Sequence, residues 1–210
     1  MLVHTYVIAV NSGAAPNYDA PMVALAVCKP RIRRKANISE LVLAFAGQKI
    51  NPYEPHTVVW AGLVKEKMTF AAYWNDARFQ TKKADRSPTA DNFYRPTEGG
   101  GLMWMENPVH GPEAAQRDLN GHLVLAFKPA WRFGANGPPL PASFGLRMTH
   151  GRRGERLTDL TDAEWRRLEA WLNNQTTIKT TRTRASAGRC QPVKRTRTPT
   201  LTQPTRSGRC

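Results

Sequence analysis

Five short apolar runs, each bounded by turn-forming or charged residues, limit most strongly what this chain can fold into. Short runs of this kind, rich in Val, Leu, Ala and aromatic residues, are typical of strands rather than of long helices. They lie at residues 5–10, 22–30, 40–47, 58–66 and 122–127, and a weaker one lies at 143–150. Strands therefore outnumber helices, and we predict an α+β fold built on a small, mainly antiparallel β-sheet with short helices.

The first helix signal follows the fourth apolar run. Thr69 is suited to cap a short helix, and Phe70, Tyr73 and Trp74 follow it at helical spacing. The three rings would share one face of that helix.

The second helix signal is the clearest in the chain. Thr161 and Glu164 have the spacing of a capping box, and Leu160 precedes Thr161 at the position from which it can pack on Trp165. Apolar residues then recur at helical spacing, which predicts a C-terminal helix from Asp162 to about Leu172.

Composition changes abruptly after this helix. Residues 174–210 contain mostly Thr, Arg, Ser, Pro, Lys and Gln, with too few large apolar side chains to offset the entropy of ordering. From Thr176 onward the chain has two Lys, seven Arg and no acidic residue, so this part carries +9 of the net +15 and the rest +6. We predict one globular domain, residues 1–173, and a disordered basic tail, residues 174–210.

The cysteines and histidines indicate neither a disulfide framework nor a metal site. Cys28, Cys190 and Cys210 are odd in number and lack paired spacing, and the five histidines show no ligand-type spacing. No signal peptide or membrane span is evident, so the expected location is cytoplasmic. No cofactor is predicted, because the phosphate-loop and dinucleotide motifs are absent.

The densest positive charge follows directly after the second apolar run, at residues 28–35. If the segment is an extended loop, Arg31 and Arg33 lie two residues apart and present their guanidinium groups on one face. With Lys29 they could bind phosphate, so nucleic acid or a nucleotide is the expected partner, with DNA favoured and no membrane partner. The alternative is a solvated charged turn.

Aromatic residues interleaved with cations form the second binding pattern. Bases stack on aromatic rings while cations hold the backbone, so such a mixture suits a flipped or single-stranded base. Most of the rings must belong to the core. The residues selected to surround a base are Tyr73, Trp74, Trp104 and Lys82.

Two residues have both a catalytic and a non-catalytic interpretation. Cys28, at the end of an apolar run, is a candidate nucleophile or a small buried residue, and His110, in a polar loop, is a candidate base or merely polar. Asn11 and Asn17, in the turn after the first run, are candidates to orient a substrate or contact nucleic acid.

Several of these residues also occur in the order of a known family. Ala15-Pro16-Asn17, the segment 28–33 with Ala36, and the segment 70–74 with Phe79 resemble the second of the nucleotide-modification-associated domain families. The resemblance covers roughly residues 5–134. It implies a bacterial or phage origin and a role near DNA base modification. The family has an acidic residue where this chain has Asn11, and Gly-Asp where it has Ser39-Glu40, so no catalytic residue is carried over.

The order of elements is also similar to PUA-like and EVE-like barrels that bind modified bases, so a PUA-like barrel is the alternative fold. Three functions remain. The leading one is a nucleic-acid or nucleotide binding domain of a base-modification system. The others are a nucleotide-modifying enzyme that uses Cys28 or His110, and an inert domain whose basic tail alone binds nucleic acid.

Overall fold

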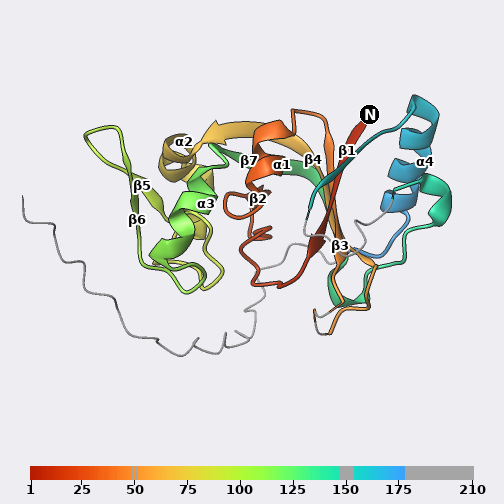
Figure 1. Cartoon of the computed structure of the whole chain (residues 1–210), viewed down its shortest axis with the longest axis horizontal. Coiled ribbons are helices and arrows are strands. Elements are labelled where there is room, and N and C mark those ends of the chain that lie inside the picture. The colour runs from red at the N-terminus through yellow and green to blue at the C-terminus, as the bar shows by residue number, and fades with distance from the viewer. Residues whose placement is uncertain (49, 51, 147–153, 178–210) are drawn as a thin grey trace, which may run out of the picture.

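The computed structural model describes residues 1–48, 50, 52–146 and 154–177, and a mixed six-stranded sheet dominates it (Figure 1). The strand order is β2-β7-β4-β3-β1-β8. Only β1 and β3 pair in parallel, and every other neighbouring pair is antiparallel. The strands are β1 (Leu2–Ile8), β2 (Val23–Leu25), β3 (Leu41–Ala46), β4 (Val58–Thr69), β7 (Leu123–Arg132) and β8 (Arg156–Asp159). The α+β prediction is confirmed, and the described sheet does not close into a barrel.

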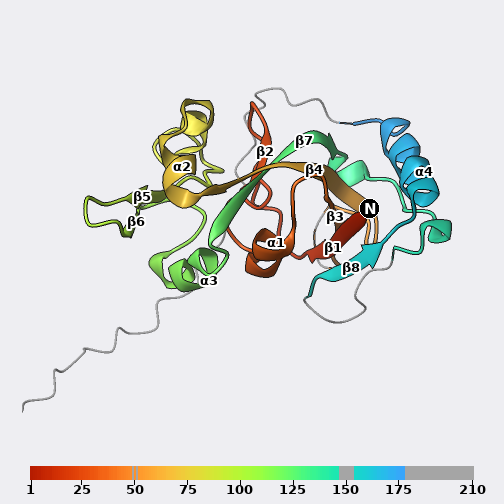
Figure 2. The same ribbon diagram turned by 90° about the horizontal axis from the view of Figure 1, so that it is seen from above.

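Helices and a small second sheet lie around this sheet. Strands β5 and β6 pair beside α2 and α3 at one end of the molecule, and α4 lies at the opposite end (Figure 2). The long strand β4 runs between the two ends. The remaining elements are α1 (Pro30–Lys35), α2 (Phe70–Asn75), β5 (Tyr94–Pro96), β6 (Leu102–Trp104), α3 (Ala115–Leu119), α4 (Asp162–Asn173) and four 3₁₀ turns at Ala77–Lys82, Pro112–Ala114, Gly134–Asn136 and Ala142–Phe144.

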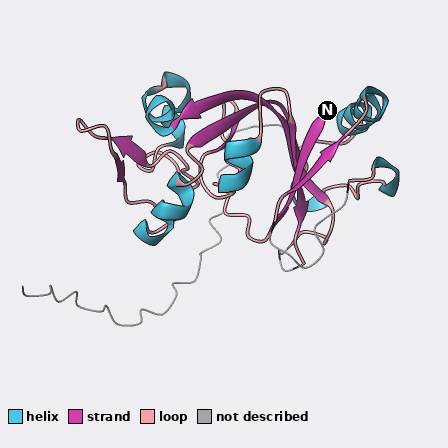
Figure 3. Ribbon diagram, turned by 45° about the horizontal axis from the view of Figure 1, so that its top comes forward, coloured by secondary structure: helices cyan, strands magenta, loops and turns pink. Residues whose placement is uncertain are grey.

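Both predicted helices are present with the caps that the sequence indicated (Figure 3). The Thr69 hydroxyl accepts a hydrogen bond from the Ala72 N–H at 3.1 Å at the start of α2. At the start of α4, Thr161 and Glu164 form the capping box in both directions. The side chain of Trp165 packs into the same apolar cluster as Leu160, at the end of the large sheet.

Two strand predictions are wrong in extent. The run at 22–30 forms a strand only over Val23–Leu25, because the backbone turns at Cys28 and Pro30 begins α1. The run at 143–150 begins inside the 3₁₀ turn Ala142–Phe144, and its part from 147 onward lies outside the described residues.

The core is densest where β3 and β4 cross the middle of the sheet. All six residues of β3 are buried. The fully buried Trp60 ring packs edge-on against Tyr6, Tyr18 and Phe127, and its indole N–H donates to the Tyr6 hydroxyl at 2.9 Å. The same apolar cluster includes Val23 and Leu25 of β2, the short strand that precedes the turn into α1.

None of the described helices is long and apolar enough to span a membrane. The predicted tail, residues 174–210, lies almost wholly outside the described residues, so the boundary at 173 remains a prediction.

Candidate active site

Cys28 stands on a sharp turn between β2 and α1. Its φ is 56°, and Lys29 follows with φ 41° and ψ 48°, so two consecutive non-glycine residues adopt the left-handed conformation. Side chains make this conformation costly, and such strain persists where the surrounding structure holds it. A strained turn from a strand into a helix is also how α/β hydrolases present a nucleophile.

Hydrogen bonds from distant residues hold this turn in place. The Cys28 N–H donates to Asp118 Oδ1 at 2.8 Å, and Arg33 Nε donates to the Cys28 carbonyl at 2.8 Å. Both backbone polar groups of Cys28 are therefore satisfied, and its side chain is held in a half-buried position.

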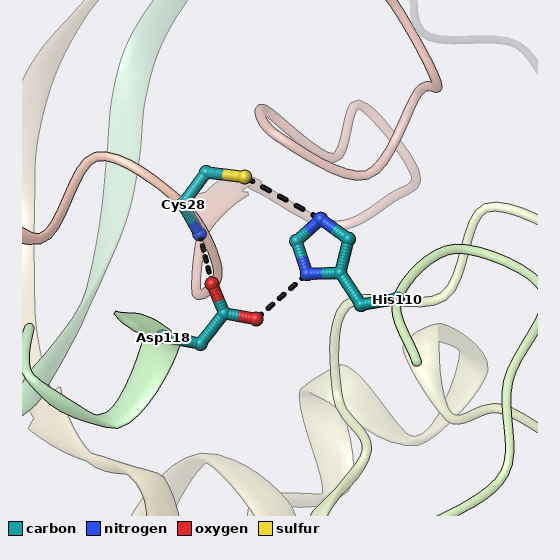
Figure 4. A group of neighbouring side chains, drawn as sticks. All are labelled: Cys28, His110 and Asp118. Carbon is teal, nitrogen blue, oxygen red and sulfur yellow. Dashed lines mark hydrogen bonds and ion pairs between the residues drawn. The ribbon is translucent and has the colours of Figure 1, made fainter. Parts of the chain in front are cut away.

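His110 lies beside the sulfur, in the loop between β6 and α3 (Figure 4). Its Nε2 is 3.4 Å from Cys28 Sγ, and its Nδ1 is 2.7 Å from Asp118 Oδ2. The loop is fixed on both sides: Asn107 Oδ1 accepts from the His110 N–H at 2.8 Å, and Trp104 Nε1 donates to the His110 carbonyl at 3.2 Å. The ring is thus oriented with Nε2 toward the sulfur and Nδ1 toward the carboxylate.

Asp118, on α3, is completely buried and saturated with donors. Besides Cys28 and His110, the Tyr94 hydroxyl donates to its Oδ2 at 3.1 Å. Burial acts to raise the pKa of Asp118, but the hydrogen bonds from His110 and from the Cys28 N–H outweigh it and lower this pKa. The carboxylate is therefore charged at neutral pH.

The imidazole of His110 carries the charge opposite to that of the Asp118 carboxylate. Burial acts to lower the pKa of His110, yet its hydrogen bonds to Asp118 and Cys28 raise it to about 9. At neutral pH the ring is an imidazolium whose Nε2–H faces Cys28 Sγ. The positive charge therefore lies 3.4 Å from Cys28 Sγ.

Arg33 forms hydrogen bonds to the backbone around the site. The guanidinium is fully buried and donates to three carbonyls: Cys28 at 2.8 Å, Leu123 at 2.9 Å and Asp118. A Cβ added at Gly121 would lie 2.2 Å from Arg33 Cζ, so the guanidinium occupies space that only a glycine leaves open. Arg33 thereby joins the turn at Cys28 to α3 and β7.

The expectation that residues 28–35 form an extended loop is wrong. Pro30–Lys35 is a helix, so Arg31 and Arg33 do not share a face. Arg31 is exposed, whereas the Arg33 guanidinium is buried and each of its three nitrogens donates to a carbonyl. Phosphate binding by this pair as a two-pronged fork is not possible in this arrangement. Lys29 donates to the Val7 carbonyl at 3.0 Å and lies over the Tyr6 ring.

Of the other residues selected for binding, Tyr73, Lys82 and Asn17 lie in one buried cluster, and the rest lie elsewhere. Lys82 and Asn17 are buried and bonded to each other at 2.8 Å, and the buried Tyr73 donates to Asp91 at 2.7 Å. Trp74 is half-buried under the Lys83 amine. Asn11 donates to the Tyr53 hydroxyl. Trp104, through its bond to the His110 carbonyl, is the member of this group that touches the Cys28 site.

Cys28, His110 and Asp118 also have the residue types of a metal site, which the sequence did not suggest, and their ligand atoms lie within 4.8 Å of one another. The hydrogen bonds argue for a relay instead. Asp118 Oδ2 lies on the Nδ1 side of the ring and Cys28 Sγ on the Nε2 side, so the imidazole stands between them. Both carboxylate oxygens already accept hydrogen bonds.

Asp118 is the functional residue that the sequence analysis did not select. It lies 90 residues from Cys28 and belongs to the short helix α3, which no periodicity announced. Its only signal in the sequence is an acidic residue close after His110, which is too common to stand out.

The fold and site define an α+β domain with a half-buried Cys–His–Asp constellation at a strand-to-helix turn. The chain matches the family described as nucleotide modification associated domain 2 over residues 1–187, and it belongs to that family. The resemblance found in the sequence is confirmed. A search of curated proteins and a search of solved structures gave no match.

Proposed function

We propose that this protein is a nucleotide-modifying enzyme in which Cys28 is the nucleophile, His110 the general acid and base, and Asp118 the group that orients the imidazole. The observation that carries the proposal is the relay itself, with Sγ 3.4 Å from Nε2 and Nδ1 2.7 Å from the buried carboxylate. This is the geometry of an activated nucleophile, a base and an orienting group.

The chemistry that this relay supports is transfer of a group through a covalent thio-intermediate. Cys28 Sγ attacks an electrophilic carbon of the substrate and forms an S–C bond. The bond from that carbon to its leaving group breaks, and the leaving group takes the proton of His110. Water or a second substrate then gives a proton to His110, attacks the same carbon and releases the thiolate.

Asp118 keeps the imidazole in the useful tautomer and supports its positive charge. Tyr94 and the Cys28 N–H keep this carboxylate in place, and burial protects it from water. No step requires Asp118 to change protonation.

Family membership supports a nucleotide as the substrate. Binding alone, the leading interpretation of the sequence, is less well supported. A pure binding domain has no need of a strained cysteine aligned with a charged imidazole, and Arg33, Asn17, Lys82 and Tyr73 have their polar groups turned inward.

Cysteine alkylation tests the relay without knowledge of the substrate. The full chain with Cys190→Ser and Cys210→Ser keeps Cys28 as its single thiol and is treated with iodoacetamide at pH 6.5. We expect Cys28 to react at least about tenfold faster than the same chain in denaturant, because the imidazolium favours the thiolate. His110→Asn should remove this advantage, and circular dichroism should show an unchanged fold.

Mass spectrometry tests the substrate. The same chain is incubated with nucleotides and oligonucleotides carrying modified bases, and adducts on Cys28 are sought, with Cys28→Ala as the control. Alkylation at the denatured rate, or equal alkylation in folded His110→Asn, would overturn the proposal.

A further inference from the structure

We propose that the exposed faces of α1 and α3, together with the neighbouring part of β4, bind the sugar–phosphate backbone of a nucleic-acid strand. We call this surface the α1–α3 basic face and define it as Arg31, Arg34, Lys35, Lys67 and Arg117. The claim about the substrate rests on the proposed function. It deepens that function by making the reacting nucleotide part of a polymer.

Helix α1 separates its residues into two sides. Ile32 and Arg33 are buried against the sheet and α3, whereas Arg31, Arg34 and Lys35 are exposed. Residues three and four apart lie on the same side of a helix, so these three cations share one face. The helix contains no acidic residue to neutralise them.

Side-chain contacts continue this face onto α3. Arg34 Nη1 donates to Asn120 Oδ1, at the C-terminal end of α3, at 2.7 Å. On the same helix Arg117 is exposed, with its Nε 3.6 Å from Asp118 Oδ1. Because Arg33 joins the Cys28 turn to α3 from within, the two helices hold a fixed relation to each other.

The face also continues onto β4 beyond the end of α1. Lys67 Nζ donates to Asn37 Oδ1 at 3.3 Å, two residues after Lys35. The neighbouring acid Glu40 has no recorded bond to Lys67 among the described residues. Its carboxylate is bonded to Asn37 and to the buried His4.

Five cations on three elements fit a chain of phosphates better than one nucleotide. A single phosphate group is satisfied by one or two arginine forks, while a strand offers a phosphate at every nucleotide. The surface also begins at the catalytic residues: Arg31 lies three positions after Cys28, and Arg117 immediately precedes Asp118. A strand bound here passes beside the Cys28–His110 pair.

Fluorescence anisotropy with labelled oligonucleotides tests this inference on the full chain. Arg31→Ala combined with Lys35→Ala removes two cations that have no hydrogen-bond or ion-pair partner among the described residues. The matched control is Arg166→Ala with Arg167→Ala, an equal loss of exposed charge on α4, which lies away from α1 and α3 (Figure 2).

We expect the α1 double variant to bind on the order of tenfold more weakly and to lose about two units of the salt slope. The α4 double variant should change both much less. Equal effects of the α1 and α4 double variants would overturn the proposal. Competition by a free mononucleotide that is as strong as competition by an oligonucleotide, at equal nucleotide concentration, would also overturn it. The proposal would also be overturned if the α1 double variant lost binding to acidic protein or to anionic vesicles but bound oligonucleotides as the wild type does.

The alkylation rate of Cys28 separates this inference from the proposed function. The α1 double variant should keep that rate, because neither changed side chain touches the relay. If Cys28 is alkylated at the rate of the denatured chain while the α1 double variant still binds oligonucleotides more weakly, the inference about the α1–α3 basic face holds and the proposed enzymatic function is wrong.

Discussion

Two clusters of buried titratable side chains among the described residues differ in how far their members are exposed. The first is the Cys28–His110–Asp118 relay. The second, which we call the Lys82 cluster, consists of Lys82, Asn17, Asp91 and Tyr73. Lys82 Nζ donates to Asn17 Oδ1 at 2.8 Å and to its carbonyl at 3.2 Å, and the Tyr73 hydroxyl donates to Asp91 Oδ1 at 2.7 Å.

Perturbed pKa values occur in both clusters. Burial lowers the pKa of Lys82 to about 8 and raises that of Asp91 to about 7. In the relay, hydrogen bonds overcome burial and raise the pKa of His110 to about 9. Perturbation therefore does not by itself mark a reactive site.

Access makes the difference. Lys82 and Asp91 are at most 1% exposed, whereas Cys28 is half-buried and the His110 side chain is 15% exposed. The Lys82 cluster joins the loop after β1 to the segment after α2, which is the work of a structural cluster. The relay combines a candidate nucleophile with partial exposure of Cys28 and His110.

Removing the buried amine should have the largest effect. Lys82→Met leaves Asp91 without its neighbouring cation and removes one of the two donors to each Asn17 oxygen. Loss of one partner of a buried ionic group costs about 3–5 kcal/mol of unfolding free energy, which urea denaturation would measure. Lys83→Met, next in sequence and placed over the Trp74 ring, should cost less than about 1 kcal/mol. Equal losses would show that the buried amine has no special structural role.

A smaller effect is expected beneath the relay. Gly121→Ala places a methyl group 2.2 Å from Arg33 Cζ and forces the guanidinium off its carbonyl partners. Overpacking of this kind costs about 1–3 kcal/mol, measured by thermal or urea unfolding. It should also lower the alkylation rate of Cys28, whose carbonyl Arg33 holds. Gly99→Ala, which meets no atom within 4 Å, is the control. If Gly121→Ala leaves both the unfolding free energy and the Cys28 alkylation rate unchanged, Arg33 does not position the Cys28 turn.

The two clusters should also show opposite pH dependences of stability. The folded pKa of His110, about 9, lies above its ordinary value of 6.5, so its contribution is complete below pH 6.5 and is lost as pH rises to about 9. The folded pKa of Lys82, about 8, lies below 10.5, so the unfolded chain binds more protons between these values and stability rises with pH.

Difference curves isolate each group. Unfolding free energy of the wild type minus that of His110→Asn should fall from pH 6.5 to 9. The wild type minus Lys82→Met should rise from pH 8 to 10.5. Two curves of the same sign would contradict the contrast between a hydrogen-bonded charge and a desolvated one.

Local patterns in the sequence determined much of the architecture. Apolar runs predicted five of the six strands of the large sheet but not β8, and the capping residues Thr69 and Thr161 predicted the starts of α2 and α4. These signals act within a few residues of each other, so no knowledge of the fold is needed to interpret them. Cys28 and His110 were recognisable as candidates by residue type alone.

Only the tertiary structure decided which candidates work together. Cys28 meets His110 across 82 residues and Asp118 across 90, and neither separation leaves a local pattern. The same holds for Arg33, whose run of cations is typical of a solvated turn. Its burial depends on three carbonyls brought together from the Cys28 turn, α3 and β7. A buried guanidinium is tolerated only where such partners satisfy it, and they come together only when the chain folds.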